Sequence, residues 1–264
     1  MASSNAAKSA SRREQLRAAR EREAAAARRK RITVVAVAVV VAAVLVAVIA
    51  MAAGGVFGKR SGGSGATSTV VSVRPPHASP GDKGVFSADN VNDSAPVLTV
   101  VDYFQCPICH TYETVFGPVF ESLAKKGEIR LEYRTRYFLD INLKNDSSVR
   151  AARAAAIADT FGKYQEYHDT VFSNQPAKEG VGYTDDQLRD AFPQAAGITG
   201  DDLSTFQSSY DKGEMNAFVD AVDRQAQADG YNGTPTFLAN DRKIDMPRKT
   251  NPTEDDIMKL VRGV

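Results

Sequence analysis

The chain has 264 residues, of which 43% are hydrophobic and 25% charged, and its formal net charge is +1, a composition typical of globular proteins with one or two domains. The charge is unevenly distributed, because residues 1–31 carry a net of +7 and residues 59–60 add +2, which leaves −8 for residues 61–264. A mildly acidic body of this kind argues against nucleic-acid binding.

An uncharged segment, residues 32–57, follows the basic tail, and its apolar run Ile32–Ala53 is 22 residues long. As a helix this run spans roughly 33 Å, enough for a bilayer core of about 30 Å. We therefore predict a transmembrane helix at 32–57. The basic residues before it place the tail, 1–31, in the cytoplasm. A signal peptide cleaved near Ala50-Met51-Ala52 is the alternative, but such peptides have only about 7 to 15 apolar residues.

Either way, we expect the remainder of the chain to leave the cytoplasm, as part of a single-pass protein of the cell membrane that contacts the lipid bilayer through residues 32–57. Residues 58–83 contain SGGSG and PPHASPG, a composition typical of a flexible linker. The folded domain is predicted to occupy 84–264, and His77 is expected to be an inert part of the linker.

The domain begins with a β-α-β pattern. Val97–Tyr103 is a β-branched apolar run typical of a central strand, and helical spacing follows from Pro107 to about Lys125, with a kink expected at Pro118. Ile129–Arg134 alternates like a strand. The two strands are predicted to be parallel, with a right-handed connection.

A helical insertion, about 145–230, is predicted next. Its expected helices are Ser147–Phe161, Lys163–Phe172, Thr184–Phe192, Asp201–Tyr210 and Met215–Asp229. Strands are then expected at Thr236–Ala239 and Lys243–Ile244, with a turn at Asn240-Asp241 and a last helix at Thr253–Val261. Thr253 and Asp256 have nearly the spacing of a capping box at the start of that helix.

The chain has two cysteines, Cys106 and Cys109, in one C-x-x-C motif at the predicted start of a helix. Backbone N–H groups and the helix dipole stabilise negative charge there, so Cys106 should be the thiolate nucleophile and Cys109 the buried resolving thiol. The chain has no further thiol and three histidines, so the spacing does not indicate a zinc site, and no metal or cofactor is predicted.

Three neighbours are expected to tune the pair. Pro107 suits the first helical turn, Ile108 adds no charge between the sulfurs, and His110 lies just outside them. The string C-x-x-C-H is also the attachment signature of c-type haem, with His110 as axial ligand. That alternative stays open, although a strand before the motif and a long helix after it favour a redox site.

A second motif, Gly233-Thr234-Pro235-Thr236-Phe237, opens the later strand. Together with VVDYFQCPIC, YRTRYFLD, AARAAAIAD, YHDTVFSNQP and GYTDDQL, it makes residues 84–264 resemble the DsbA-like thioredoxin-fold proteins, especially the membrane-anchored ones of actinobacteria. The resemblance implies an α/β thioredoxin-like fold with the helical insertion placed before a cis-proline strand.

The resemblance also implies that Pro235 is cis and lies against the cysteines, and that the backbone of Thr234 pairs with an extended substrate. It implies that the insertion caps the site, that Cys106 is exposed, and that a membrane partner of the DsbB or VKOR type restores the disulfide. One position departs from the family, because Val100 stands where an acid often manages the proton of the resolving thiol. Asp102 could reach the site through water, or could serve only the end of the strand. His168 is expected to be a paired helix-face histidine.

We therefore expect thiol–disulfide exchange on exported cysteine-containing proteins, with the chain as disulfide donor, because export favours oxidation. A reductase or isomerase of the same fold is the closest alternative. A surface binding module whose C-x-x-C is only a structural disulfide is the non-enzymatic one.

Overall fold

The computed structural model describes residues 73–90, 92–247 and 250–263. The predicted cytoplasmic tail, 1–31, and the predicted transmembrane helix, 32–57, lie outside these residues and stay predictions. Among the described residues, no helix is both long and apolar enough to span a bilayer.

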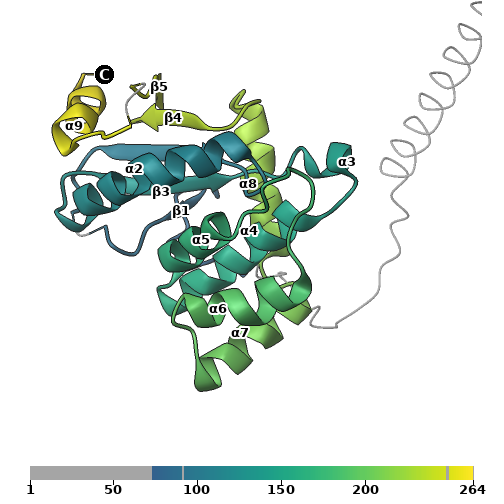
Figure 1. Ribbon diagram of the computed structural model, residues 1–264. Coiled ribbons are helices and arrows are strands. Elements are labelled where there is room, and N and C mark those ends of the chain that lie inside the picture. Colours follow the sequence, from purple (N-terminus) through teal and green to yellow (C-terminus); the bar gives the residue numbers. More distant parts are fainter. Residues whose placement is uncertain (1–72, 91, 248–249, 264) are drawn as a thin grey trace, which may run out of the picture. The chain divides into compact units, whose positions relative to one another are not determined.

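A five-stranded sheet with the order β1-β3-β2-β4-β5 forms the centre of the domain (Figure 1). The strands β2 (Val97–Asp102) and β3 (Arg130–Thr135) are parallel, and α2 (Pro107–Lys125) connects them, which confirms the predicted β-α-β unit. β4 (Thr236–Ala239) pairs antiparallel with the other side of β2. Every residue of β2 except the first is buried, as an apolar central strand requires.

The two edge strands are short. β5 (Arg242–Ile244) pairs antiparallel with β4 after a turn in which Asn240 and Asp241 have φ of 50° and 62°, a conformation that Asn and Asp tolerate better than most residues. β1 (Val85–Phe86) pairs antiparallel with β3 on the opposite edge. The sequence did not predict β1, because two residues are too few to show an alternation.

The helical insertion lies between β3 and β4, where the sequence placed it, and its larger helices gather beside the sheet (Figure 1). Its elements are α3 (Asp140–Leu143), α4 (Ser147–Ala158), η1 (Asp159–Phe161), α5 (Tyr164–Ser173), η2 (Gln187–Ala191), α6 (Phe192–Ala195), α7 (Gly200–Lys212) and α8 (Asn216–Ala228). Two predicted helices change geometry along their length, because η1 is a 3-10 turn and η2 is a π-helical turn. The short helix α3 was not predicted.

Two helices pack on each other beside the sheet. The C-terminal helix α9 (Glu254–Arg262) contacts α2, and the side chain of Thr253 caps it by accepting a hydrogen bond from the backbone of Asp256, in a complete capping box. Pro118 lies inside α2, and the helix continues through it to Lys125. Glu254, at the start of α9, accepts hydrogen bonds from Ser122 and Lys126, so this contact lies at the C-terminal end of α2.

The final part of the predicted linker is folded onto the domain. His77 donates its backbone N–H to Asp159 Oδ2 at 2.8 Å, and its Nδ1 lies 2.8 Å from Asp159 Oδ1. Ala78 forms a bridge with Val85. The expected boundary at residue 83 therefore falls within a folded segment. His77, expected to be inert, attaches that segment to the insertion because Asp159 is a buried carboxylate that needs a partner.

Candidate active site

The two cysteines lie at the N-terminus of α2, as predicted. Cys106 caps the helix, and its Sγ accepts a hydrogen bond from the backbone N–H of Cys109 at 3.3 Å. Cys109 is 1% exposed and Cys106 is 7% exposed, so Cys106 is the more accessible of the two. It is not the exposed residue that the resemblance implied. The backbone of Thr234 lies against it, with the carbonyl oxygen 3.7 Å from Sγ.

The two thiols differ in acidity. Hydrogen bonds from Cys109 lower the pKa of Cys106 to about 6, in spite of its burial, which acts in the other direction. Burial, followed by the neighbouring Cys106 sulfur, raises the pKa of Cys109 well above its usual range. At neutral pH the geometry therefore favours a thiolate at Cys106 and a protonated thiol at Cys109, which are the states that a nucleophile and a resolving cysteine require.

The residues beside the pair differ in what they contribute. Pro107 occupies the first turn of α2, and Ile108 is 58% exposed and presents an apolar side chain beside Cys106. His110 turns toward α5, where its Nδ1 donates to the carbonyl oxygen of Phe172 at 2.9 Å. Haem attachment would need both sulfurs at an accessible surface, and the burial of Cys109 argues against it.

The Thr234–Pro235 peptide bond is cis, as the resemblance implied, and directly precedes β4. It forms one side of a groove of about 600 Å³ beside the cysteines. Ile108 and Tyr112 line the groove from α2, and residues 234–237 and 243–246 line it from β4 and the hairpin. In this groove the predicted substrate-binding residues, Thr234 and Pro235, meet Ile108, one of the two residues between the cysteines.

A buried acid does lie near the pair, but not at the position usual for the family. Val100 is 1% exposed and apolar, whereas Asp102 is fully buried, and its Oδ2 lies 2.7 Å from His168 Nε2. The Asp102 carboxylate also helps to raise the pKa of Cys109, after burial and the Cys106 sulfur. Asp102 thus has both a structural partner on α5 and an electrostatic effect on the buried thiol.

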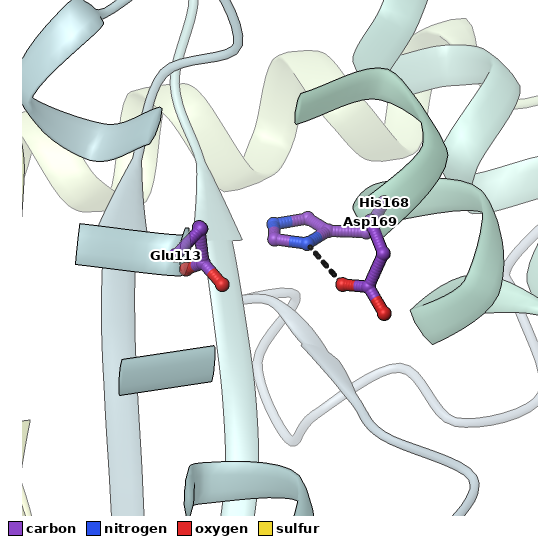
Figure 2. Close-up of side chains that lie close together, drawn as sticks. All are labelled: Glu113, His168 and Asp169. Atoms are coloured by element: carbon purple, nitrogen blue, oxygen red, sulfur yellow. Dashed lines mark ion pairs between the residues drawn. The ribbon is translucent and has the colours of Figure 1, made fainter. Parts of the chain in front are cut away.

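His168 lies in the core rather than on a helix surface. Its ring is fully buried, with ring centroids 4.1 Å from Tyr133 and 4.9 Å from Phe172. Its second nitrogen, Nδ1, lies 3.5 Å from Asp169 Oδ1, and Glu113 of α2 lies across from the ring (Figure 2). Burial opposes the charged imidazole, but the neighbouring carboxylates outweigh it and raise the pKa of His168 to about 10.

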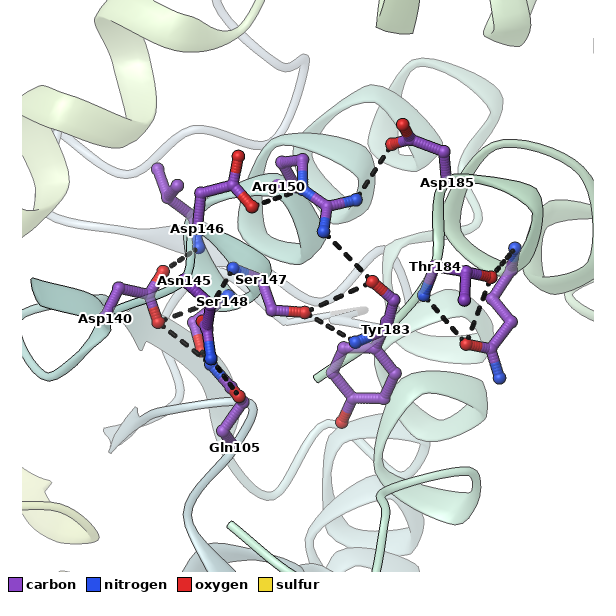
Figure 3. Close-up of polar contacts among 12 residues, drawn as sticks. Gln105, Asp140, Asn145, Asp146, Ser147, Ser148, Arg150, Tyr183, Thr184 and Asp185 are labelled. Carbon is purple, nitrogen blue, oxygen red and sulfur yellow. Dashed lines mark hydrogen bonds and ion pairs between the residues drawn. The ribbon is translucent and has the colours of Figure 1, made fainter. Parts of the chain in front are cut away.

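A polar network that the sequence did not reveal holds the loop before the first cysteine. The Nε2 of Gln105 donates to Asp140 Oδ1 at 2.9 Å and lies 3.0 Å from both Asn145 Oδ1 and Ser148 Oγ (Figure 3). Asp140 also accepts a hydrogen bond from the backbone N–H of Val149 at 2.9 Å. The same carboxylate therefore binds Gln105 in the loop and caps the start of α4. The network connects the active-site loop to the start of the insertion.

Two further side chains of the insertion bind backbone carbonyls of the same loop. Gln175 Nε2 donates to the carbonyl oxygens of Phe104 at 2.8 Å and of Cys106 at 3.1 Å. The Tyr183 hydroxyl donates to the Phe104 carbonyl at 2.8 Å. Neither residue was singled out from the sequence. Both lie in segments that carry the family resemblance, Gln175 in YHDTVFSNQP and Tyr183 in GYTDDQL, and this was the only sequence feature that pointed to them.

The sequence matches one family model, described as thioredoxin, over residues 92–261. A comparison with curated proteins found no significant match. Several solved structures are similar. The reduced DsbA of Mycobacterium tuberculosis is 25% identical, with a TM-score of 0.51, over 62% of this chain and 86% of that one.

A disulfide bond oxidoreductase of the same organism, DsbG, is 26% identical, with a TM-score of 0.54, over 71% of this chain and 90% of its own. The thiol–disulfide oxidoreductase MdbA of Actinomyces oris is 19% identical, with a TM-score of 0.57, over 70% of this chain and 89% of its own, a likeness that shows the fold. The chain belongs to the thioredoxin family, and its structural neighbours are thiol–disulfide oxidoreductases of the DsbA and MdbA type.

Proposed function

We propose that this protein is a thiol–disulfide oxidoreductase that donates the disulfide of Cys106 and Cys109 to cysteine-containing proteins exported from the cytoplasm. One observation carries the proposal: at the start of α2, the pKa of Cys106 is lowered to about 6 while the pKa of its buried partner is raised. The similar MdbA of Actinomyces oris is a thiol–disulfide oxidoreductase, and the similar DsbG of Mycobacterium tuberculosis is a disulfide bond oxidoreductase.

The exchange takes place in two steps. A substrate thiolate attacks Cys106 Sγ of the oxidised pair, so the bond between the two cysteines breaks and a mixed disulfide forms. Cys109 leaves as a thiolate and takes up a proton, because its pKa is high. A second substrate thiolate then attacks the substrate sulfur of the mixed disulfide and releases Cys106 as a thiolate. Two electrons have passed from the substrate to the pair.

The stability of the released Cys106 thiolate supports the donor direction. The backbone N–H of Cys109 and the N-terminus of α2 stabilise its charge, so the reduced protein is favoured and the disulfide accepts electrons readily. DsbA is strongly oxidising, at about −120 mV, for the same reason, whereas thioredoxin lies near about −270 mV. A reductase or isomerase is the alternative with the same fold.

Thr234 and Pro235 are proposed to bind the substrate. The pairing of β2 with β4 begins at Thr236, so the backbone of Thr234 takes no part in that ladder. An extended substrate could pair with this backbone and place its sulfur near Cys106, with neighbouring side chains in the groove beside Ile108 and Tyr112.

The location and the partner are proposed from the sequence. Residues 32–57 would anchor the protein in the cell membrane, with the basic tail, 1–31, in the cytoplasm and the redox domain outside. Each turnover leaves the pair reduced, so an electron acceptor must restore the disulfide. A membrane enzyme of the DsbB or VKOR type, as the family resemblance implies, would supply that step.

The reduction potential of the pair tests the function. The full-length protein, in detergent, is equilibrated with glutathione buffers, and its visible spectrum is recorded on the same sample. A potential near about −120 mV supports the disulfide donor, and one near about −270 mV indicates a reductase. A haem absorption band would end the oxidoreductase proposal. If the pair is only structural, a Cys109→Ser variant will not accumulate mixed disulfides on Cys106.

A further inference from the structure

A second group of reactive side chains lies on another face of α2, away from the substrate groove. Glu113 of α2 and the adjacent His168 and Asp169 of α5 bring one ligand atom each within 4.8 Å of one another. Figure 2 shows the Glu113 carboxylate on one side of the imidazole and the Asp169 carboxylate on the other. The three donors therefore converge from two helices on one point.

The imidazole is oriented so that one nitrogen faces this point. His168 Nε2 bonds to Asp102 Oδ2 at 2.7 Å, which fixes the ring and leaves Nδ1 toward Asp169. Nδ1 is fully buried and makes no hydrogen bond to the described residues, although it lies within ion-pair distance, 3.5 Å, of Asp169 Oδ1. Metal-binding histidines usually have this arrangement, in which a carboxylate holds one ring nitrogen and the other nitrogen binds the ion.

An acidic groove leads from solvent to the cluster. It has a volume of about 260 Å³ and is lined by Glu113 and Asp169, by Glu121 about two turns further along α2, and by His110. No lysine or arginine is among its lining residues in the described chain. Its three carboxylates, those of Glu113, Glu121 and Asp169, make the groove a place where a cation would meet acidic side chains.

We propose that Glu113, His168 Nδ1 and Asp169 form a binding site for a divalent transition-metal ion of the zinc class. One imidazole and two carboxylates match the ligands of such ions, whereas Ca²⁺ and Mg²⁺ prefer oxygen ligands alone. The ion takes the place of a proton on Nδ1, and water completes its coordination. Bond lengths of about 2.0 to 2.2 Å require the three donors to move inward slightly, which the flexible Glu113 side chain permits.

The expected consequence is a link between α2 and α5. The site lies on the helix that begins with the cysteines, but it includes neither sulfur. The C-x-x-C thiols could themselves bind zinc, so a test must exclude them. The oxidised protein, in which both sulfurs are in the disulfide, provides that exclusion.

The experiment uses the untagged, oxidised, full-length protein in detergent, first stripped with a chelator. Zn²⁺ binding is measured by calorimetry, and Co²⁺ binding by its visible absorption, in which a thiolate charge-transfer band would reveal ligation by cysteine. We expect one ion per chain, no thiolate band, and a rise in the unfolding temperature with ion concentration. Absence of binding to the oxidised protein would overturn the proposal.

Near-isosteric variants locate the ligands. Glu113→Gln and Asp169→Asn each remove a proposed ligand and should weaken binding by about ten-fold or more. Asp102 is not a ligand but orients the imidazole ring, so Asp102→Asn should weaken binding by roughly 10 to 100-fold. Glu121→Gln is the matched control, because Glu121 lines the same groove outside the cluster, and its affinity should stay unchanged. If Glu113→Gln and Asp169→Asn, with circular dichroism like that of the parent, bind as tightly as the parent, the ion is elsewhere and the proposal is wrong.

Discussion

The helix α2 has two faces of opposite character. The face with Ile108 and Tyr112 is uncharged and borders the open groove at Thr234, while the face with His110 and Glu113 packs toward α5 and its charged residues. The accessible face lies beside the reactive sulfur, and the charged face holds the helix against the insertion. The α2 side of the groove is therefore neutral, and the charged residues in its lining, Lys243 and Asp245, come from the opposite side.

The largest expected effect separates the two sulfurs. Cys106→Ser should lower the rate of disulfide transfer by roughly 10³-fold or more and form no mixed disulfide, as expected when a nucleophile is removed. Cys109→Ser should lose turnover to a similar extent but retain the substrate covalently on Cys106. Non-reducing electrophoresis with a reduced model peptide distinguishes them. Equal trapping by both variants would contradict the assigned roles.

The charged face of α2 packs toward α5, whose buried ion pair with β2 is tested next, with a pair whose histidine is exposed as the control. His168–Asp102 and His77–Asp159 have similar distances, 2.7 and 2.8 Å, but the His168 side chain is 0% exposed and that of His77 is 41% exposed. His168→Gln should reduce the free energy of unfolding by about 3 to 5 kcal/mol, because it leaves Asp102 buried and unpaired. His77→Gln should reduce it less, because the backbone N–H of His77 still donates to the buried Asp159 carboxylate.

Urea unfolding of both variants in the presence of a chelator measures this difference without any contribution from bound metal. If the two variants lose a similar free energy of unfolding, burial of the histidine does not determine how much each pair contributes to stability.

The neutral face should show a pH-dependent thiolate. The pKa of Cys106 is lowered from 9.0 to about 6 in the folded protein. Its thiolate therefore stabilises the reduced protein fully above about pH 9, and this contribution is lost as the pH falls through about 6. The difference in unfolding free energy between the reduced parent and Cys106→Ser should shrink over that range. Thiolate absorbance should show a midpoint near pH 6, and a midpoint near 9 would contradict the geometry.

The smallest expected effect comes from charging the neutral face. Ile108→Lys should raise the reduction potential by about 20 mV or less, since an exposed charge contributes about 0.2 to 1 kcal/mol and 30 mV corresponds to about 1.4 kcal/mol. Ile108→Glu should lower the potential by a similar amount. Shifts of the same sign in both variants would show that shape rather than charge at this position acts on Cys106.

Local patterns were sufficient for most of the fold. The strands β2 and β4, the long helices and the capping box at Thr253 follow from apolar periodicity and from signals within a few residues of each element. The cis bond at Pro235 came from the family resemblance, because spacing alone does not specify a cis bond.

The surroundings of the site were less predictable, because they depend on which faces of distant elements meet. The His168–Asp102 pair joins residues 66 positions apart, and Gln105 reaches Ser148 across 43. No local pattern in the sequence specifies these partners. The sequence contains an acid at 102 and a histidine at 168, but only the folded structure shows that the Asp102 carboxylate bonds to the His168 ring.

The short edge strands also affect how the protein behaves at high concentration. β1 has two residues, and β5 has three, of which Arg242 and Lys243 are exposed and charged. Very short edge strands, and charged ones such as β5, are poor templates for further strands, so neighbouring copies should resist edge-to-edge aggregation. Under the proposed function, an extended substrate would likewise find little to pair with at either edge of the sheet, which favours the backbone of Thr234 beside Cys106.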